Sequence, residues 1–86
     1  MIVKFHKSFI KSYRRLPLKI KQKADQKMRL FSQNQKAMEL NVHTLSGKYN
    51  GYMSMNITGD YRALYKIVSK NEVRFMEIGT HAQLYE

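Results

Sequence analysis

Apolar positions in the first half of the chain predict one strand and two helices. Residues 2–5 (Ile-Val-Lys-Phe) alternate as in a short strand. Apolar side chains recur at helical spacing over residues 9–16, and Ser8 is a suitable N-cap for this helix. Pro17 ends the helix, because proline lacks a backbone N–H and restricts the residue before it. A second apolar stripe predicts a helix over residues 18–33, so that the two helices form a hairpin with an apolar inner face.

The second half of the chain has the pattern of strands joined by tight turns. Residues 52–57, 61–69 and 72–78 are rich in β-branched and aromatic side chains and predict three strands. The short connections between them contain Gly, Asp and Asn, which favour hairpin turns and therefore antiparallel pairing. Gly79 is expected to end the third strand, and the remaining residues to form a tail or a single helical turn.

Together these elements predict the fold class. Neither the helices nor the sheet can bury an apolar side alone, so the helices must cover one face of the sheet. We expect an α+β fold of two layers, in which an N-terminal strand, a helical hairpin and a three-stranded antiparallel meander (β-α-α-β-β-β) give a four-stranded sheet. The other sheet face would stay partly open and could hold a ligand. At 86 residues, the chain is expected to be a single domain over residues 1–86.

The charge of the chain is large and unevenly distributed. The formal net charge is +10, of which residues 1–40 contribute +9 and residues 41–86 only +1. Such a field attracts phosphate backbones and steers association. A polyanion, or an acidic protein, is therefore favoured as the partner over a basic helix face that is merely solvated.

The composition also excludes some kinds of chemistry. The chain has no cysteine, which rules out disulfides, cysteine-based zinc sites and thiol catalysis. No apolar run is long enough for a signal peptide or a membrane span. We therefore expect a cytoplasmic protein without a membrane partner.

Three stretches in the second half resemble a known superfamily. They are His-Thr-Leu-Ser-Gly-Lys-Tyr-Asn-Gly at residues 43–51, Asn-Ile-Thr-Gly-Asp-Tyr-Arg-Ala-Leu-Tyr at 56–65 and Ile-Gly-Thr-His-Ala-Gln-Leu-Tyr at 78–85. Their order and spacing resemble the RelE/ParE superfamily of type II toxins, and most closely its YafQ-like ribonuclease branch. Residues 9–17 resemble the first helix of that family, so the resemblance covers nearly the whole chain.

The resemblance implies both a fold and an activity. The fold is the microbial-ribonuclease-like arrangement of one strand, two helices and three strands. The activity is that of a toxin which cleaves mRNA in the A site of the small ribosomal subunit, as a metal-independent endoribonuclease without a cofactor. It also implies a cognate antitoxin that blocks the concave sheet face or displaces the C-terminal segment. The toxin would be a monomer within a hetero-oligomeric toxin–antitoxin complex.

Metal-free cleavage of RNA needs a base for the 2′-OH, a cation for the crowded phosphorane and an acid for the departing 5′ oxygen. His81 is the strongest candidate for the acid, since imidazole exchanges protons near neutral pH and the C-terminal histidine of the YafQ-like motif falls here. The alternative is an ordinary surface histidine. Arg62 is the candidate phosphate clamp, since guanidinium stays charged and offers a planar fork; RelE-like members carry a catalytic arginine here. The alternative is an exposed arginine paired with Asp60 or Glu77.

Three further residues match positions of the motif. His43 matches a histidine at the start of the sheet in YafQ-like toxins, where it would act as base, orient the phosphate or cap the loop. Asp60 matches an acidic position and would act as base or orient His43, unless it only serves the turn. Tyr85 would stack on a base or bind the phosphate, and Tyr61 would stack similarly, unless either belongs to the core. His6 lies outside every motif and is interpreted as structural or surface-exposed.

The chain departs from the YafQ-like pattern at two positions. Asn56 stands where those toxins carry a further histidine, which leaves the identity of the base open. Glu77 stands where they often carry an arginine, a loss for which Arg62 would compensate. The residues expected to bind RNA are Lys19, Lys23, Lys27, Arg29, Lys48 and Tyr61. The helical cations would position the protein on ribosomal RNA without reading its sequence, unless they are simply solvated.

Two other functions compete with the nuclease. ParE-like members of the superfamily act on DNA gyrase and are not ribonucleases, but they generally lack the acid–base cluster that the candidate residues form here. A nucleic-acid-binding module without catalysis would need only the basic charge.

Overall fold

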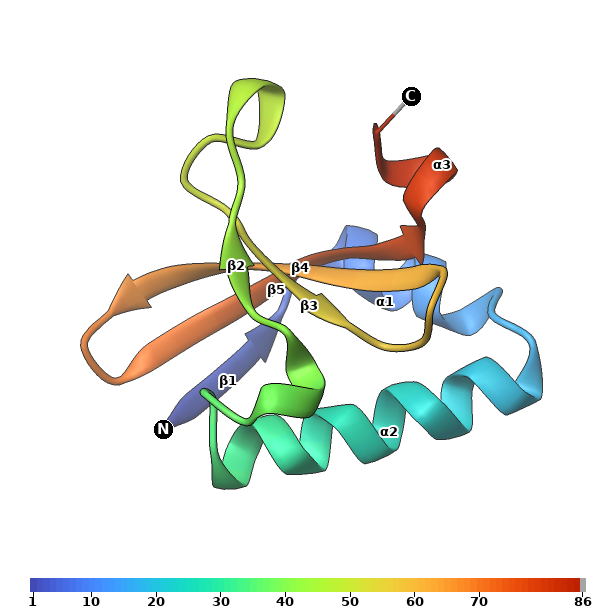
Figure 1. Ribbon diagram of the computed structural model, residues 1–86, viewed down its shortest axis with the longest axis horizontal. Helices are drawn as coiled ribbons and strands as arrows, with labels where there is room; N and C mark the ends of the chain where they lie inside the picture. The colour runs from blue at the N-terminus through green and yellow to red at the C-terminus, as the bar shows by residue number, and fades with distance from the viewer. Residues whose placement is uncertain (86) are drawn as a thin grey trace.

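The computed structural model describes residues 1–85, in which a five-stranded sheet carries two helices on one face (Figure 1). The strands are β1 (Ile2–Phe5), β2 (His43–Thr44), β3 (Met53–Asn56), β4 (Tyr61–Ser69) and β5 (Glu72–Thr80). The helices are α1 (Lys7–Arg14), α2 (Leu18–Gln33) and α3 (His81–Tyr85), with 3-10 turns η1 (Met38–Leu40) and η2 (Gly47–Tyr49). No helix within residues 1–85 is both long enough and apolar enough to cross a membrane.

The sheet order is β1-β5-β4-β3-β2, with the hairpin of β4 and β5 at its centre. β3, β4 and β5 pair antiparallel as predicted, whereas β1 pairs parallel with β5 through partners such as Val3 and Val73. The α+β class is therefore confirmed, but the prediction of four strands is wrong. The fifth strand, β2, pairs antiparallel with β3 over two residues, a length too short for any periodic pattern to mark it.

The hydrophobic core lies between the helices and the sheet. Phe31 of α2 contacts Tyr65 and Phe75 edge-on, with ring centroids 5.0 and 5.3 Å apart. Phe9 of α1 packs on Phe75 from the other helix, with centroids 5.8 Å apart. These contacts fix both helices on the same sheet face and leave the opposite face for the short elements.

The two N-terminal helices begin and end largely where the sequence predicts. α2 has the predicted bounds, and Pro17 precedes it with a φ of −56° that suits the start of a helix. The prediction of Ser8 as the N-cap of α1 is wrong: His6 is the N-cap, and its Nδ1 accepts a hydrogen bond of 3.1 Å from the Ser8 N–H. His6 therefore has the structural role that was one of its two interpretations.

The sheet face opposite the helices supports α3 and the arm formed by β2, η2 and β3, which both rise from it (Figure 1). Along β4, Ala63 and Tyr65 enter the core, so the alternating Arg62 and Leu64 lie on this second face. The prediction that Gly79 ends β5 is wrong, because β5 continues to Thr80. α3 therefore follows the strand directly, without a connecting loop.

Candidate active site

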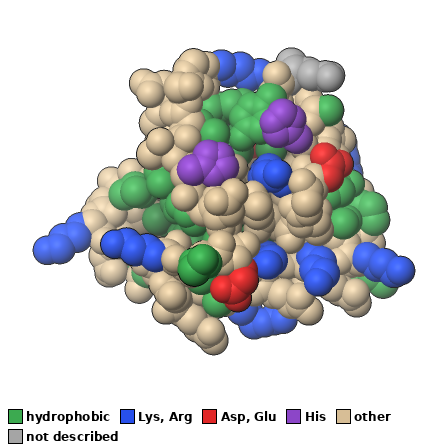
Figure 2. Space-filling model, viewed as in Figure 1, with side chains coloured by type: hydrophobic (Ala, Val, Ile, Leu, Met, Phe, Trp, Pro, Cys, Tyr) green, Lys and Arg blue, Asp and Glu red, His purple; other side chains and the backbone are tan. Residues whose placement is uncertain are grey.

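A cavity of about 360 Å³ lies on this second sheet face. Its lining residues are Asn41, His43, Leu45, Ser54, Arg62, His81 and Tyr85. Four of the five residues predicted to be catalytic thus line one cavity, although they come from three separate elements. Figure 2 shows two histidine side chains on this face, with a Lys or Arg side chain between them.

His43 is held by its backbone surroundings in a defined tautomer. It lies on β2 opposite Ser54, and its Nδ1 is 2.9 Å from the carbonyl oxygen of Asn41. Since a carbonyl oxygen only accepts, Nδ1 must carry the hydrogen, and Nε2 of the neutral ring keeps a free lone pair. His43 is therefore arranged to accept a proton at Nε2.

The guanidinium of Arg62 is anchored to the turn between β3 and β4. Its Nη1 donates to the carbonyl oxygens of Thr58, Gly59 and Tyr61 at 2.9, 3.1 and 3.1 Å. The one ion pair within residues 1–85 joins Lys4 and Glu72, so pairing of Arg62 with Asp60 or Glu77 is not what the structure shows. Guanidinium has five N–H donors, so it can bind oxygens of a ligand while Nη1 holds its position.

His81 opens α3, whose first turn is fixed by a capping box. The Thr80 N–H donates to Gln83 Oε1 at 2.8 Å, and the Gln83 N–H donates to Thr80 Oγ1 at 3.1 Å. The His81 N–H donates to the Asp60 carbonyl oxygen at 3.0 Å, which ties α3 to the same turn that anchors Arg62. The exposed His81 ring packs on Tyr85, with centroids 4.6 Å apart.

The capping box predicts that Gln83→Ala loosens α3 without unfolding the protein. Loss of a cap typically costs about 1 kcal/mol, which is large for a helix of five residues. We expect faster amide hydrogen exchange at Leu84 and Tyr85, measured by NMR, and an unchanged core. Gln35→Ala, which removes a side-chain bond to the Phe31 carbonyl oxygen elsewhere, is the matched control. Unaltered exchange in α3 would show that the capping box does not hold it.

Asp60 and Tyr61, two neighbours of Arg62 that were predicted to take part, do not line the cavity. The Asp60 side chain is exposed in the turn after β3, and the residue contributes through its backbone, which accepts from His81 and donates to Thr58 Oγ1. Tyr61 packs against the core on the helix side and lines a different cavity with Leu16 and Ile78. Of its two interpretations, the structure supports the one in which Tyr61 belongs to the core.

The basic residues of α2 divide between two faces. Lys23 and Lys27 line a second cavity of about 360 Å³ together with Thr58 and Gly59, the residues whose carbonyl oxygens hold Arg62. Lys19 lies one turn before Lys23 on the same stripe. This basic stripe (Lys19, Lys23, Lys27) therefore lies beside the turn that anchors Arg62. Arg29 lies on another side of the helix, and Lys48 lies on η2.

Ser54 is a cavity residue that sequence reasoning missed. It is fully buried on β3, yet its Oγ has no hydrogen-bond partner within the described residues. Such a hydroxyl costs about 1–3 kcal/mol, so an oxygen of a ligand is its natural partner. The sequence does contain a pattern that could have identified Ser54. Ser54 and Asn56 alternate with two methionines along the strand, which places the two polar side chains on the same sheet face. Asn56 Oδ1 and Glu77 Oε1 are also buried without a partner among residues 1–85.

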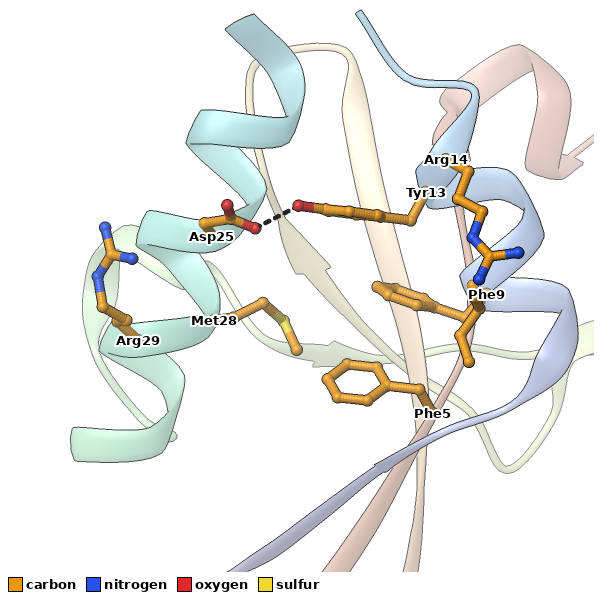
Figure 3. Close-up of a pocket in the computed structure, with 8 residues that line it drawn as sticks. Phe5, Phe9, Tyr13, Arg14, Asp25, Met28 and Arg29 are labelled. Atoms are coloured by element: carbon orange, nitrogen blue, oxygen red, sulfur yellow. Dashed lines mark hydrogen bonds between the residues drawn. The ribbon is translucent and has the colours of Figure 1, made fainter. Parts of the chain in front are cut away.

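An apolar groove of about 550 Å³ lies on the helix side, between α1, α2 and the end of β1 (Figure 3). Its apolar lining residues are Phe5, Phe9, Ile10, Tyr13 and Met28. Tyr13 bridges the two helices by donating to Asp25 Oδ1 at 2.7 Å, a bond that raises the pKa of the Tyr13 hydroxyl. Arg14, Arg29 and Asp25 complete the lining, so the groove combines an apolar floor with a net positive charge.

The chain matches known proteins in family and in fold. Over residues 1–86 it matches the family described as the bacterial toxin of type II toxin-antitoxin system, YafQ. No curated protein matches its sequence. YafQ from E. coli strain BL21(DE3) has 23% identity and a TM-score of 0.78, covering 98% of this chain and 97% of that one.

Two other solved structures have the same fold. The YoeB/ParE toxin from Agrobacterium tumefaciens has 20% identity and a TM-score of 0.77, covering 94% of this chain and 99% of that one. A chain of the RelB-RelE antitoxin-toxin complex from Methanococcus jannaschii has 18% identity and a TM-score of 0.76, covering 96% of this chain and 95% of that one. At these identities, the likeness concerns the arrangement of the backbone.

Proposed function

The chain belongs to the YafQ family of bacterial toxins of type II toxin-antitoxin systems, and from this premise we propose that it is a ribosome-dependent, metal-independent endoribonuclease acting on mRNA. The observation that carries the proposal is the convergence of His43, Arg62 and His81 on one cavity. Two imidazoles and a guanidinium supply the base, the acid and the positive charge that the reaction needs. The same three residues weigh against a gyrase-directed toxin, because that activity does not require acid–base catalysis on RNA.

The hydrogen bonds of the site support an assignment of the base, the cation and the acid to particular residues. His43 Nε2 takes the proton of the 2′-OH, because Nδ1 is committed to the Asn41 carbonyl oxygen. The 2′ oxygen attacks phosphorus while Arg62 binds the non-bridging oxygens. His81 donates a proton to the 5′ oxygen as its bond to phosphorus breaks, leaving a 2′,3′-cyclic phosphate and a free 5′-OH. Since His43 supplies the base, the absence of a histidine at Asn56 does not disable the mechanism.

Two neutral residues would assist this reaction. Ser54 Oγ, buried and without a partner among residues 1–85, would donate to a phosphate oxygen. Tyr85, in contact with His81, would hold the ring in place and stack on an adjacent base. Asp60 would act only by shaping the turn, and Tyr61 has no part in this mechanism.

The proposed partners are an antitoxin, the ribosome and mRNA. The apolar groove between α1 and α2 suits an amphipathic antitoxin segment with acidic residues that face Arg14 and Arg29. The solved RelB-RelE relative is an antitoxin-toxin complex, which supports a partner of this kind. This site differs from the concave sheet face or C-terminal segment expected from the family resemblance. Because the groove and the cavity lie on opposite sides of the sheet, an antitoxin bound in the groove should be unaffected by substitutions in the cavity.

The basic stripe predicts how the protein holds ribosomal RNA. Reversing the charges of Lys19, Lys23 and Lys27 to Glu is expected to weaken co-sedimentation with ribosomes and to make binding less sensitive to salt. The salt slope should fall by roughly 0.7–0.9 for each phosphate that the variant no longer neutralises. The matched control reverses Lys7, Lys11 and Lys70, which lie away from this stripe. Equal weakening by both triple variants would mean that net charge alone, and not the stripe, attracts the ribosome.

The direct test of the proposed function adds the purified protein to a translation extract. We expect mRNA to be cut within translated codons, which primer extension maps, and the upstream fragments to end in 2′,3′-cyclic phosphate. DNA breaks with intact mRNA would instead favour the gyrase-directed function. Retention on RNA without cleavage would favour a non-catalytic binding module.

A further inference from the structure

A row of tyrosines continues outward from the candidate active site. The Tyr85 ring, which packs on His81, lies 5.8 Å from the Tyr49 ring, and Tyr49 lies 5.3 Å from Tyr52, all between centroids. The rings meet edge to face, at 86° and 64°. We call Tyr85, Tyr49 and Tyr52 the tyrosine wall. It links α3 to the arm of β2, η2 and β3, which Figure 1 shows rising on the same side of the sheet.

Backbone geometry presents the middle ring of the wall. η2 begins at Gly47 and is followed, after Asn50, by Gly51; their φ angles of +65° and +90° are values that glycine adopts without strain. Tyr49 is half-buried, and burial, followed by the charge of Glu77, raises the pKa of its hydroxyl. Like any tyrosine near neutral pH, Tyr49 carries no charge and does not repel a phosphate. Figure 2 shows a patch of hydrophobic side chains, a class that includes tyrosine, beside the upper histidine on this face.

Two flexible cations lie on the wall. Lys48 Nζ is 5.2 Å from the Tyr49 ring centroid, and Lys66 Nζ is 4.7 Å from that of Tyr52. Both lysines are exposed, where a cation–π contact strengthens association only about 2- to 5-fold. Stacking of a nucleobase on an aromatic ring contributes about 5- to 150-fold. A base should therefore displace the ammonium groups from the rings, and they would then bind the adjoining phosphates.

We propose that the tyrosine wall is a binding subsite for one nucleobase of the RNA, adjacent to the phosphodiester held by Arg62 and His81. The inference rests on the proposed function and extends it, by adding a contact with the RNA outside the reacting atoms. Tyr49 is the central stacking residue, and Lys48 and Lys66 bind the flanking backbone. Because every base has an aromatic face, the subsite detects the presence of a base more than its identity.

The test uses purified ribosomes programmed with an mRNA that the protein cleaves, and a matched mRNA with an abasic nucleotide next to the cleavage position. Each is cleaved by the wild type and by Tyr49→Ala under single-turnover conditions. We expect Tyr49→Ala to slow cleavage of the intact mRNA about 10-fold or more. On the abasic mRNA, the two proteins should differ by less than about 2-fold, because the stacking partner of Tyr49 is already missing.

The abasic nucleotide is placed in turn at each position that flanks the cleavage site. If Tyr49→Ala slows cleavage by the same factor on the intact and on every abasic mRNA, the subsite is overturned. The proposed nuclease activity would still stand. Absence of cleavage by the wild type on programmed ribosomes would overturn the proposed function and this inference with it. Tyr49→Phe keeps the aromatic ring and should therefore cleave the intact mRNA at a rate close to that of the wild type. If Tyr49→Ala does not fold, as judged by circular dichroism, Tyr49→Leu keeps the apolar bulk but lacks the aromatic face and takes its place.

Discussion

Replacing His81 with alanine is expected to slow mRNA cleavage by about 10²- to 10⁴-fold, the usual contribution of one acid–base partner. The loss should fall on the chemical step, because the 5′ oxygen would then depart as an unprotonated alkoxide. Single-turnover cleavage on programmed ribosomes measures this rate directly. Binding of the antitoxin and the thermal midpoint should change little, since His81 is exposed at the start of α3.

A modified substrate distinguishes an acid from a residue that only binds RNA. If sulfur replaces the departing 5′ oxygen, the leaving group is a thiolate that needs no proton. The His81→Ala variant should then approach the wild-type rate, whereas a variant of His43, the proposed base, should remain slow. If the sulfur substrate leaves the His81 defect undiminished, His81 does not act as the general acid.

The second large effect is expected at Arg62. Arg62→Gln removes the positive charge but keeps an amide that can still donate to the turn carbonyls, so the fold should be preserved. Loss of one charged donor to the transition state typically costs about 10²- to 10³-fold in rate. Arg74→Gln, a change at an exposed arginine of β5 that does not line the cavity, is the matched control. A rate for Arg62→Gln within a few-fold of the control would remove Arg62 from the mechanism.

The order of the elements could be predicted from the sequence because each long element has a clear period. α2 and β4 have the predicted bounds, since their apolar side chains repeat over 16 and 9 residues. β2 could not be predicted, because its two residues are defined by pairing with β3 and not by a pattern of their own. His6 was missed as the N-cap because its ring nitrogen replaces the hydroxyl that usually serves there.

The sequence predicts those residues of the candidate site whose side-chain chemistry and motif position identify them. It does not predict the residues whose place in the site depends on the three-dimensional fold. His43, Arg62 and His81 matched a motif and line one cavity. Tyr61, next to Arg62 in sequence, lies on the other sheet face, because neighbouring side chains along a strand point to opposite sides. The tyrosine wall joins Tyr49 and Tyr52 to the distant Tyr85, so no local sequence pattern predicts it.

The anchoring of Arg62 has an evolutionary consequence. Its Nη1 is held by three main-chain oxygens, and every amino acid supplies an oxygen of that kind. The residue at position 59 can therefore vary among homologues without misdirecting the guanidinium, whereas Tyr61 is also constrained by its packing on the core. An insertion or deletion in this turn would move the oxygens themselves, so we expect relatives that retain this arginine to vary the turn's composition while conserving its length.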